Sequence, residues 1–245
     1  MKPTIIRLTE TGSTNSYAIE MLSKTHPDEG SVIITDQQTQ GKGTDTNSWE
    51  SEKGKNLTFS LILYPNLTAD RQFTLNKAIS LGICHFLREE LHENKVTIKW
   101  PNDIYSDDKK VCGILIQNSI TGNQLNYMVV GIGLNVNQTN FKSDAPNPVS
   151  MKMITGKTYN LNEILDKLLK FIFEKYANLK SASGQQIENE YHNALYRLEE
   201  WHEFIAKGEK THAKINGTNI YGQLVLETEN SQLLTCDLSE VKFII

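Results

Sequence analysis

KWPND at residues 99–103 opens a stretch that continues with KKVCGIL at 109–115 and GIGLN at 131–135. The apolar residues of these segments are typical of buried strands. A fold by itself requires neither a Trp-Pro-Asn-Asp corner nor a Lys-Lys pair at the start of a buried run. The stretch therefore predicts strands whose ends hold the polar residues of a functional site.

The hydrophobic pattern on either side of this stretch predicts a mixed α/β fold. Strands at 96–100, 111–118 and 127–136 are joined by short, turn-rich links, which predicts antiparallel neighbours. The links are residues 103–110 and 119–126. Other elements follow from apolar periodicity: strands at 5–8 (an edge strand), 31–35 and 56–64, and helices at about 14–23, 68–93, 162–179 and 185–197.

Two parts of the chain differ in character from this pattern. Residues 36–55 are polar, contain glycine and show no hydrophobic period, which is typical of a functional loop. Beyond residue 197, short strands at 211–215, 221–227, 232–237 and 241–245 predict a small β-barrel. We expect two domains, a mixed sheet flanked by helices over 1–197 and the barrel over 198–245.

The composition indicates a globular protein that binds neither nucleic acid nor membrane. With 245 residues and 38% hydrophobic residues, the chain can bury a core without disulfides. A net charge of −4 and the absence of a Lys/Arg stripe argue against nonspecific nucleic-acid binding. No apolar run approaches a membrane span, no signal peptide is evident, and the three cysteines lack metal-binding spacing. We therefore expect a cytoplasmic protein.

Four segments together resemble the biotin protein ligase family. They are Ser13-Thr14-Asn15, Gln38–Gly43 followed by Trp49, Lys99–Leu115, and Gly131–Asn135. The resemblance implies a biotin/lipoate ligase-like catalytic domain followed by an SH3-like barrel. It implies that biotin reacts with ATP and Mg²⁺ to form biotinyl-5′-AMP, and that a lysine of a biotin carboxyl carrier protein then receives the biotin. The family pattern begins within the first 15 residues, so we expect a short form without the N-terminal DNA-binding domain of some relatives.

The resemblance assigns the catalytic step to Lys110 and Asp103. Lys110 matches the family lysine that holds the biotin carboxylate and the α-phosphate together, a role that suits a fixed cation. Asp103 would position Lys110 or activate the incoming amine. From the residues alone, Lys110 could be a surface lysine in a turn and Asp103 a turn carboxylate.

The resemblance also assigns residues to the nucleotide. The matching adenylate-binding loop contains Lys42, Gly43, Thr44 and Trp49. Lys110 is assigned to the nucleotide as well. Asn102 and Asn135 match polar residues near the phosphates, and no residue is assigned as a direct metal ligand. Either asparagine could instead bond the local backbone, Trp49 could simply pack at the exit of the loop, and Lys99 could bind phosphate or pair structurally.

The biotin pocket is assigned to a third set of residues. Biotin is a neutral bicyclic urea on an apolar tail, so it needs a snug pocket with a few directed hydrogen bonds. Ser13-Thr14-Asn15 is also a good helix N-cap, and the glycines could equally mark a bulge. The residues that the resemblance implies are Ser13, Thr14, Asn15, Gln38, Gly41, Lys42, Gly113 and Gly131.

The sequence departs from the family pattern at Thr44 and Asp45, where basic residues are commoner, and at Gln117, which replaces an acidic residue.

Three other functions stay open. A lipoate or octanoate ligase would use the same fold and the same adenylation chemistry. A noncatalytic biotin sensor would bind biotin without adenylating it, and a coenzyme-A-dependent acyl transferase would use thioesters in place of ATP. A nucleophilic Cys112 would suggest acyl transfer through a thioester, but we expect Cys112 to be a buried small residue.

Overall fold

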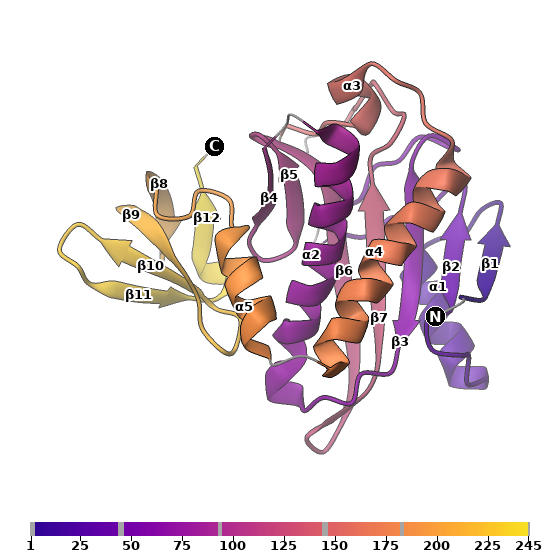
Figure 1. The fold of residues 1–245 in the computed structure, drawn as a ribbon, viewed down its shortest axis with the longest axis horizontal. Helices are drawn as coiled ribbons and strands as arrows, with labels where there is room; N and C mark the ends of the chain where they lie inside the picture. Colours follow the sequence, from indigo (N-terminus) through magenta and orange to yellow (C-terminus); the bar gives the residue numbers. More distant parts are fainter. Residues whose placement is uncertain (1–2, 44–46, 93–94, 144–146, 182–183, 245) are drawn as a thin grey trace.

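The computed structural model describes residues 3–43, 47–92, 95–143, 147–181 and 184–244. Two sheets organise the chain (Figure 1). The larger has the strand order β1-β2-β3-β7-β6-β5-β4, and the smaller has the order β11-β10-β9-β8-β12. A mixed α/β fold with helices against a mixed sheet, followed by a small β region, confirms the predicted fold class.

The larger sheet is mixed because only its first pair of strands is parallel. β1 and β2 run parallel, and every other neighbouring pair in this sheet is antiparallel. β1 lies at the edge as predicted. The strands are β1 (Ile5–Leu8), β2 (Val32–Thr35), β3 (Leu57–Leu63), β4 (Val96–Lys99), β5 (Asp103–Ser106), β6 (Lys109–Thr121) and β7 (Gln124–Leu134).

Helices cover both faces of this sheet. α2 (Gln72–Leu91) and α4 (Leu161–Ser181) pack side by side on the face drawn toward the viewer in Figure 1, with α5 (Gly184–Asn193) beside α2. α1 (Thr14–Lys24) packs on the opposite face, where Ala18 meets Ile33, Ile62 and Val129. Burial on both faces explains why all seven residues of β3 are buried, although Thr58 and Ser60 are polar.

The smaller sheet lies beside the β4 side of the larger sheet. Its strands are β8 (Trp201–Ala206), β9 (Glu209–Thr218), β10 (Leu224–Thr228), β11 (Leu233–Cys236) and β12 (Val241–Phe243). The indole of the buried Trp100 donates to the Gly222 carbonyl at 2.8 Å, and the Lys99 ammonium lies 4.6 Å from the Phe243 ring. Both contacts join the sheets. The domain division at residue 197 and the closure of the smaller sheet into an SH3-like barrel stay predictions.

The sequence pattern missed three elements. β5 lies inside the predicted link 103–110, because a four-residue strand between polar turns leaves too little periodicity to detect. β8 and the five-residue helix α3 (Met151–Thr155) were missed as well. The predicted helix at 185–197 was too long, since α5 ends at Asn193 and Arg197 has a positive φ of 59°. None of the helices in the described parts is long and apolar enough to span a membrane.

Candidate functional site

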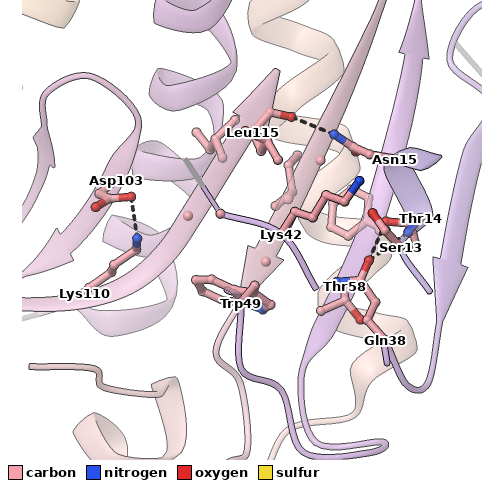
Figure 2. Close-up of a pocket in the computed structure, with 17 residues that line it drawn as sticks. Ser13, Thr14, Asn15, Gln38, Lys42, Trp49, Thr58, Asp103, Lys110 and Leu115 are labelled. Carbon is pink, nitrogen blue, oxygen red and sulfur yellow. Dashed lines mark hydrogen bonds and ion pairs between the residues drawn. The ribbon is translucent and has the colours of Figure 1, made fainter. Parts of the chain in front are cut away.

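A pocket opens between the N-terminus of α1, the loop after β2, the first halves of strands β3 and β6 and the end of β7 (Figure 2). It is partly open to solvent, and both apolar and polar side chains line it, as in many small-molecule sites. The predicted residues that line it are Ser13, Thr14, Asn15, Gln38, Lys42, Gly43, Trp49, Asp103, Lys110, Gly113 and Gly131. Most of the residues assigned from the sequence therefore lie around one cavity.

One end of the pocket is charged. Lys110 Nζ lies 2.7 Å from Asp103 Oδ1, and the two side chains stay 26% and 20% exposed. A break in the β5–β6 register brings them together: Asp103 pairs with Gly113 and Ile104 with Cys112, but Tyr105 pairs with Lys110, so Val111 is an extra residue. Such a bulge changes the face to which a side chain points. It places Lys110 on the pocket face with Gly113.

The opposite end of the pocket is neutral and buried. The first backbone N–H of α1, on Thr14, donates to Gln38 Oε1 at 2.8 Å, so the Gln38 side chain binds a helix N–H that lacks an intrahelical partner. Ser13 occupies the N-cap position, but its side chain makes no capping bond and lines the pocket instead. The Ser60 hydroxyl lies 2.7 Å from that of Thr14 and 2.6 Å from Asn15 Oδ1.

The indole of Trp49 covers the glycines between these two ends. A methyl group added at Gly133 would lie 2.3 Å from this ring, and one added at Gly113 would lie 3.0 Å from it. The ring also lies 5.6 Å from Lys110 Nζ. Its Nε1 is buried without a hydrogen-bond partner among the described residues. The Trp49 ring thus packs on Gly113 and Gly133, called the glycine floor below, and lies beside Lys110 rather than in the core of the fold.

Residues 41–43 and 47–49 of the predicted adenylate loop pair with each other, and these two paired segments are called the hairpin below. Gly43 N–H donates to the Asn47 carbonyl at 2.7 Å, and Trp49 N–H donates to the Gly41 carbonyl at 3.0 Å. A methyl group at Gly41 would lie 2.5 Å from the Trp49 carbonyl oxygen, so this glycine lets the two sides of the hairpin approach. Lys42 is exposed, with its Nζ 3.4 Å from Ser16 Oγ. Thr44, assigned to the nucleotide, lies outside the described residues.

Three other polar residues of the predicted site lie away from the pocket lining. The Asn102 amide donates to the Ile114 carbonyl, and the Asn135 amide donates to the Val149 carbonyl at 3.2 Å, so both bond the local backbone. Lys99 faces aromatic rings, and its burial lowers the pKa of its ammonium group although Asp103 acts in the opposite sense. The nucleotide roles of Asn102 and Asn135 stay predictions.

Sequence reasoning overlooked Thr58, Ser60 and Gly133. Gly133 could have been found, because in a strand it shares a face with Gly131 two residues earlier. Thr58 and Ser60 alternate with apolar residues in β3 and would face solvent in a half-buried strand, so nothing in the sequence marks them. Thr58 lines the pocket, and Ser60 lies directly behind it.

Cys112 is unsuited to acyl transfer. Its side chain is fully buried, and burial raises the pKa of its thiol far above the ordinary value. The thiolate needed for attack is therefore disfavoured at neutral pH. This agrees with the expectation of a buried small residue and weakens the thioester alternative.

Known proteins resemble this chain in sequence and in fold. The model of the biotin/lipoate A/B protein ligase family matches residues 7–135. The bifunctional ligase/repressor BirA of Bacillus subtilis is 36% identical over 130 residues, which are 51% of this chain and 38% of the relative. The biotin–[acetyl-CoA-carboxylase] ligase of Paracoccus denitrificans is 28% identical over 89% of this chain and 92% of its own length.

A solved structure agrees over nearly the whole chain. The biotin protein ligase from Aquifex aeolicus, in complex with biotin and ATP, has a TM-score of 0.80 at 27% identity and covers 98% of this chain and 99% of its own. The family model spans more than half of the chain, and its range contains the glycine floor, the neutral end and Lys110. The chain therefore belongs to the biotin/lipoate A/B protein ligase family.

Proposed function

We propose that this protein is a biotin protein ligase, which activates biotin with ATP and transfers it to a lysine of a biotin carboxyl carrier protein in the cytoplasm. The observation that carries the proposal is the contrast in Figure 2, where the Lys110–Asp103 pair and the Thr14–Gln38 contact lie at opposite ends of one pocket. An elongated acid with a polar head can place its head at one end and its carboxylate at the other. The relatives named as biotin ligases support this choice of acid.

In the first step a biotin carboxylate oxygen attacks the α-phosphorus of ATP, and the bond to the bridging oxygen breaks as pyrophosphate leaves. Two negatively charged groups must approach each other, so a fixed cation between them lowers the barrier. Lys110 supplies this charge on a strand rather than on a mobile loop. Asp103 holds the ammonium by an ion pair at 2.7 Å and so limits the positions that it can take.

In the second step the amine nitrogen of the carrier lysine attacks the acyl carbon, the bond to the phosphate oxygen breaks, and AMP leaves. The nitrogen must lose a proton, and Asp103 is the pocket carboxylate that can accept it. The anhydride must be kept from water until the amine arrives. Trp49 and the hairpin that carries Lys42 lie over the glycine floor, where they would cover the adenylate.

The neutral end favours biotin over lipoate or octanoate. Its polar side chains are buried: Thr14 and Asn15 are each 3% exposed, and Ser60 is fully buried. A ligand that covers this end without polar atoms would leave the Ser13 hydroxyl and the Gln38 amide nitrogen, which line the pocket, without partners, at a cost of about 1–3 kcal/mol each. The urea of biotin can bond with them, whereas an aliphatic chain or a dithiolane ring cannot.

Magnesium would be held mainly by the triphosphate. The described residues contain no group of three His, Cys, Asp or Glu that could bind a metal by itself, but Mg²⁺ usually needs only one or two protein oxygens beside phosphates. Near Lys110, Asp103 and Asn135 could provide them, since Asn135 Oδ1 is buried without a partner among the described residues. Such an ion would neutralise part of the negative charge of the phosphates.

ATP–pyrophosphate exchange by the purified protein tests the proposal, with biotin, lipoate and octanoate compared at equal concentrations. We expect exchange with biotin alone. Exchange with lipoate or octanoate would keep the adenylation chemistry and overturn the substrate. Biotin binding without exchange would favour the sensor, and transfer of labelled biotin to an isolated carrier protein would test the second step.

A further inference from the structure

A buried amide joins the end of the hairpin to the segment that follows β7. It belongs to Gln138, which is 1% exposed and does not line the pocket. Its Oε1 accepts from the backbone N–H of Glu52 at 2.9 Å and from the Asn56 amide at 2.6 Å. Its Nε2 donates to Glu50 Oε1 at 3.2 Å and to the Asn140 carbonyl at 2.8 Å. Three of these four partners follow the hairpin in the chain, so Gln138 ties the hairpin exit to the segment after β7.

Backbone groups fix the orientation of the Gln138 amide. The Glu52 N–H can only donate and the Asn140 carbonyl can only accept, so Oε1 and Nε2 cannot exchange places. Asn56 is oriented in the same way, because its Oδ1 accepts the Val136 N–H at 2.9 Å and its Nδ2 must then face Gln138. Every donor meets an acceptor in this cluster. A buried network that is fully satisfied is rigid.

Glu50 follows Trp49 directly and binds the same segment after β7. Its Oε2 accepts the backbone N–H of Ser143 at 2.7 Å, and the N–H of Lys142 lies 2.9 and 3.0 Å from its two carboxylate oxygens. Hydrogen bonds to a carboxylate are stronger than those between neutral groups. The residue after Trp49 is therefore held by Gln138 and by two backbone N–H groups.

The segment after β7 is itself held against the rest of the domain. Asn137 Oδ1 accepts the Tyr159 N–H and its Nδ2 donates to the Tyr159 carbonyl, both at 2.9 Å. The Asn137 N–H donates to the Lys55 carbonyl at 2.8 Å. This segment can therefore serve as a fixed support for the exit of the hairpin.

Trp49 depends on this support because no hydrogen bond of its side chain holds it among the described residues. Its Nε1 is buried without a partner there, so packing and the backbone on either side place the ring. Before the ring, the Trp49 N–H donates to the Gly41 carbonyl at 3.0 Å, and after it the chain continues into Glu50. The position of the ring on the glycine floor thus depends on Glu50 and, behind it, on Gln138.

We infer that Gln138 and Glu50 are positioning residues for the nucleotide, which act through Trp49 and keep its ring over the glycine floor beside Lys110. The inference rests on the proposed function, in which Trp49 covers the adenylate. The two residues should then control the KM for ATP and the retention of biotinyl-AMP. The neutral end of the pocket makes no hydrogen bond with them, so they should have little influence on the KM for biotin.

The test measures pyrophosphate exchange by the full-length wild type and Gln138→Leu, with ATP and biotin varied in turn. We expect Gln138→Leu to raise the KM for ATP about tenfold, because Glu52 N–H and the Asn56 amide lose their buried acceptor and the hairpin exit shifts. Stopped-flow release of biotinyl-AMP should become faster by a similar factor. The KM for biotin should stay near its wild-type value.

A double-mutant cycle tests whether Gln138 acts through Trp49. Trp49→Ala removes the ring, so adding Gln138→Leu to it should change the KM for ATP little further. Effects that simply add in the double variant would mean that Gln138 acts by another route. They would overturn the positioning role, because a general loss of stability does not require the Trp49 ring.

An exchange of partners tests the contact between the two residues. Gln138→Glu keeps the size of the side chain but places a second carboxylate beside Glu50, and like charges repel, so the KM for ATP should rise. Adding Glu50→Gln supplies an amide that can donate to the new carboxylate and should restore part of the loss. No recovery in the double variant would contradict a direct contact. The isosteric pair also carries the test where Gln138→Leu does not fold.

A matched control separates positioning from a loss of folding. Gln223 lies beside the smaller sheet, where its amide bonds Asn219 at 2.7 Å and Asp237 at 2.9 Å. Gln223→Leu removes an amide of the same size and should leave both KM values and the release of biotinyl-AMP unchanged. Thermal unfolding of each variant checks that it is folded at the assay temperature.

The outcomes distinguish this inference from the proposed function. Wild-type exchange with biotin, together with an unchanged KM for ATP and unchanged adenylate release in folded Gln138→Leu, would overturn the inference and leave the function standing. Equal increases of the KM for biotin and the KM for ATP would also overturn it. Absence of wild-type exchange with any acid would overturn the proposed function and the inference with it.

Discussion

The two ends of the pocket differ in how they hold their polar groups. At the charged end, Lys110 and Asp103 form one ion pair and remain 26% and 20% exposed, so they stay partly hydrated. At the neutral end, Ser60, Thr14 and Asn15 are at most 3% exposed and bond one another in a continuous line. Because the side chains of the charged end are partly exposed, they remain hydrated and can also contact a large, hydrated triphosphate. The side chains of the neutral end are already buried and already oriented by their hydrogen bonds.

This difference predicts which substrate each end controls. A buried hydrogen-bonded line tolerates little change, because any broken member leaves its neighbours without partners. It therefore suits recognition of one rigid head group. A partly exposed cation can shift its position slightly. It therefore suits a reaction in which negative charge develops on the phosphate and pyrophosphate leaves. Variants of the charged end should thus change the rate of adenylation, and variants of the neutral end should change the KM for biotin.

The largest effect is expected for Lys110→Ala. Removing a fixed group that stabilises charge in the transition state typically lowers kcat by about 10²–10³-fold. Pyrophosphate exchange should fall by this amount, while biotin affinity, measured by calorimetry, should change little because the neutral end is untouched. Near-normal exchange in this variant would contradict the role of Lys110.

The glycines of β7 allow a direct comparison of the two ends. An added methyl group would meet Asn15 Oδ1 at 2.5 Å in Gly131→Ala and the Trp49 indole at 2.3 Å in Gly133→Ala. Displacement of one hydrogen-bonded or packed group should cost about tenfold in each variant. We expect Gly131→Ala to raise mainly the KM for biotin and Gly133→Ala to raise mainly the KM for ATP. Equal effects on both substrates would mean that the two ends are not independent.

A smaller effect is expected for Lys42→Ala. Lys42 is exposed, and its ammonium lies 3.4 Å from Ser16 Oγ beside the pocket, where it can meet a ligand phosphate. A single exposed charge contributes about 1 kcal/mol or less, so biotinyl-AMP should leave the enzyme a few-fold faster. Stopped-flow release of the adenylate measures this rate, and an unchanged rate would show that the hairpin covers the ligand without this charge.

The smallest effect concerns Glu50 at the exit of the hairpin, and its pH dependence identifies its source. Burial would raise the pKa of Glu50, but its hydrogen bonds with Ser143, Lys142 and Gln138 outweigh burial and lower it below the usual 4.5. Because the folded-state pKa is depressed, this stabilisation is present above the unfolded pKa and is lost as the pH falls through the folded value. Glu50→Gln should therefore lower Tm at pH 7, and the difference from wild type should shrink below about pH 4.5. A difference that is constant with pH would rule out the carboxylate as its source.

Local patterns in the chain predicted the class of fold and most of the pocket residues. Apolar periodicity is a local property, so it located β3, β6, β7 and the long helices α2 and α4, and the polar interruptions at 99–103, 109–115 and 131–135 marked the strands that carry the site. The motif around Gln38 and Lys110 could be matched to a family because residue types and spacing are written directly in the chain. These predictions required no knowledge of which residues, distant in the sequence, contact one another in the fold.

Only the tertiary structure decided which side chains act together. The bulge at Val111 turns Lys110 onto the pocket face, and it depends on a register with β5 that hydrophobic periodicity does not encode. Ser60 looks like an ordinary polar position of a half-buried strand, and it joins the neutral end only because α1 covers that face of the sheet. Both features depend on pairing between segments distant in sequence, and the free energy of those pairings, not local propensity, places Lys110 at one end of the pocket and Ser60 behind the other.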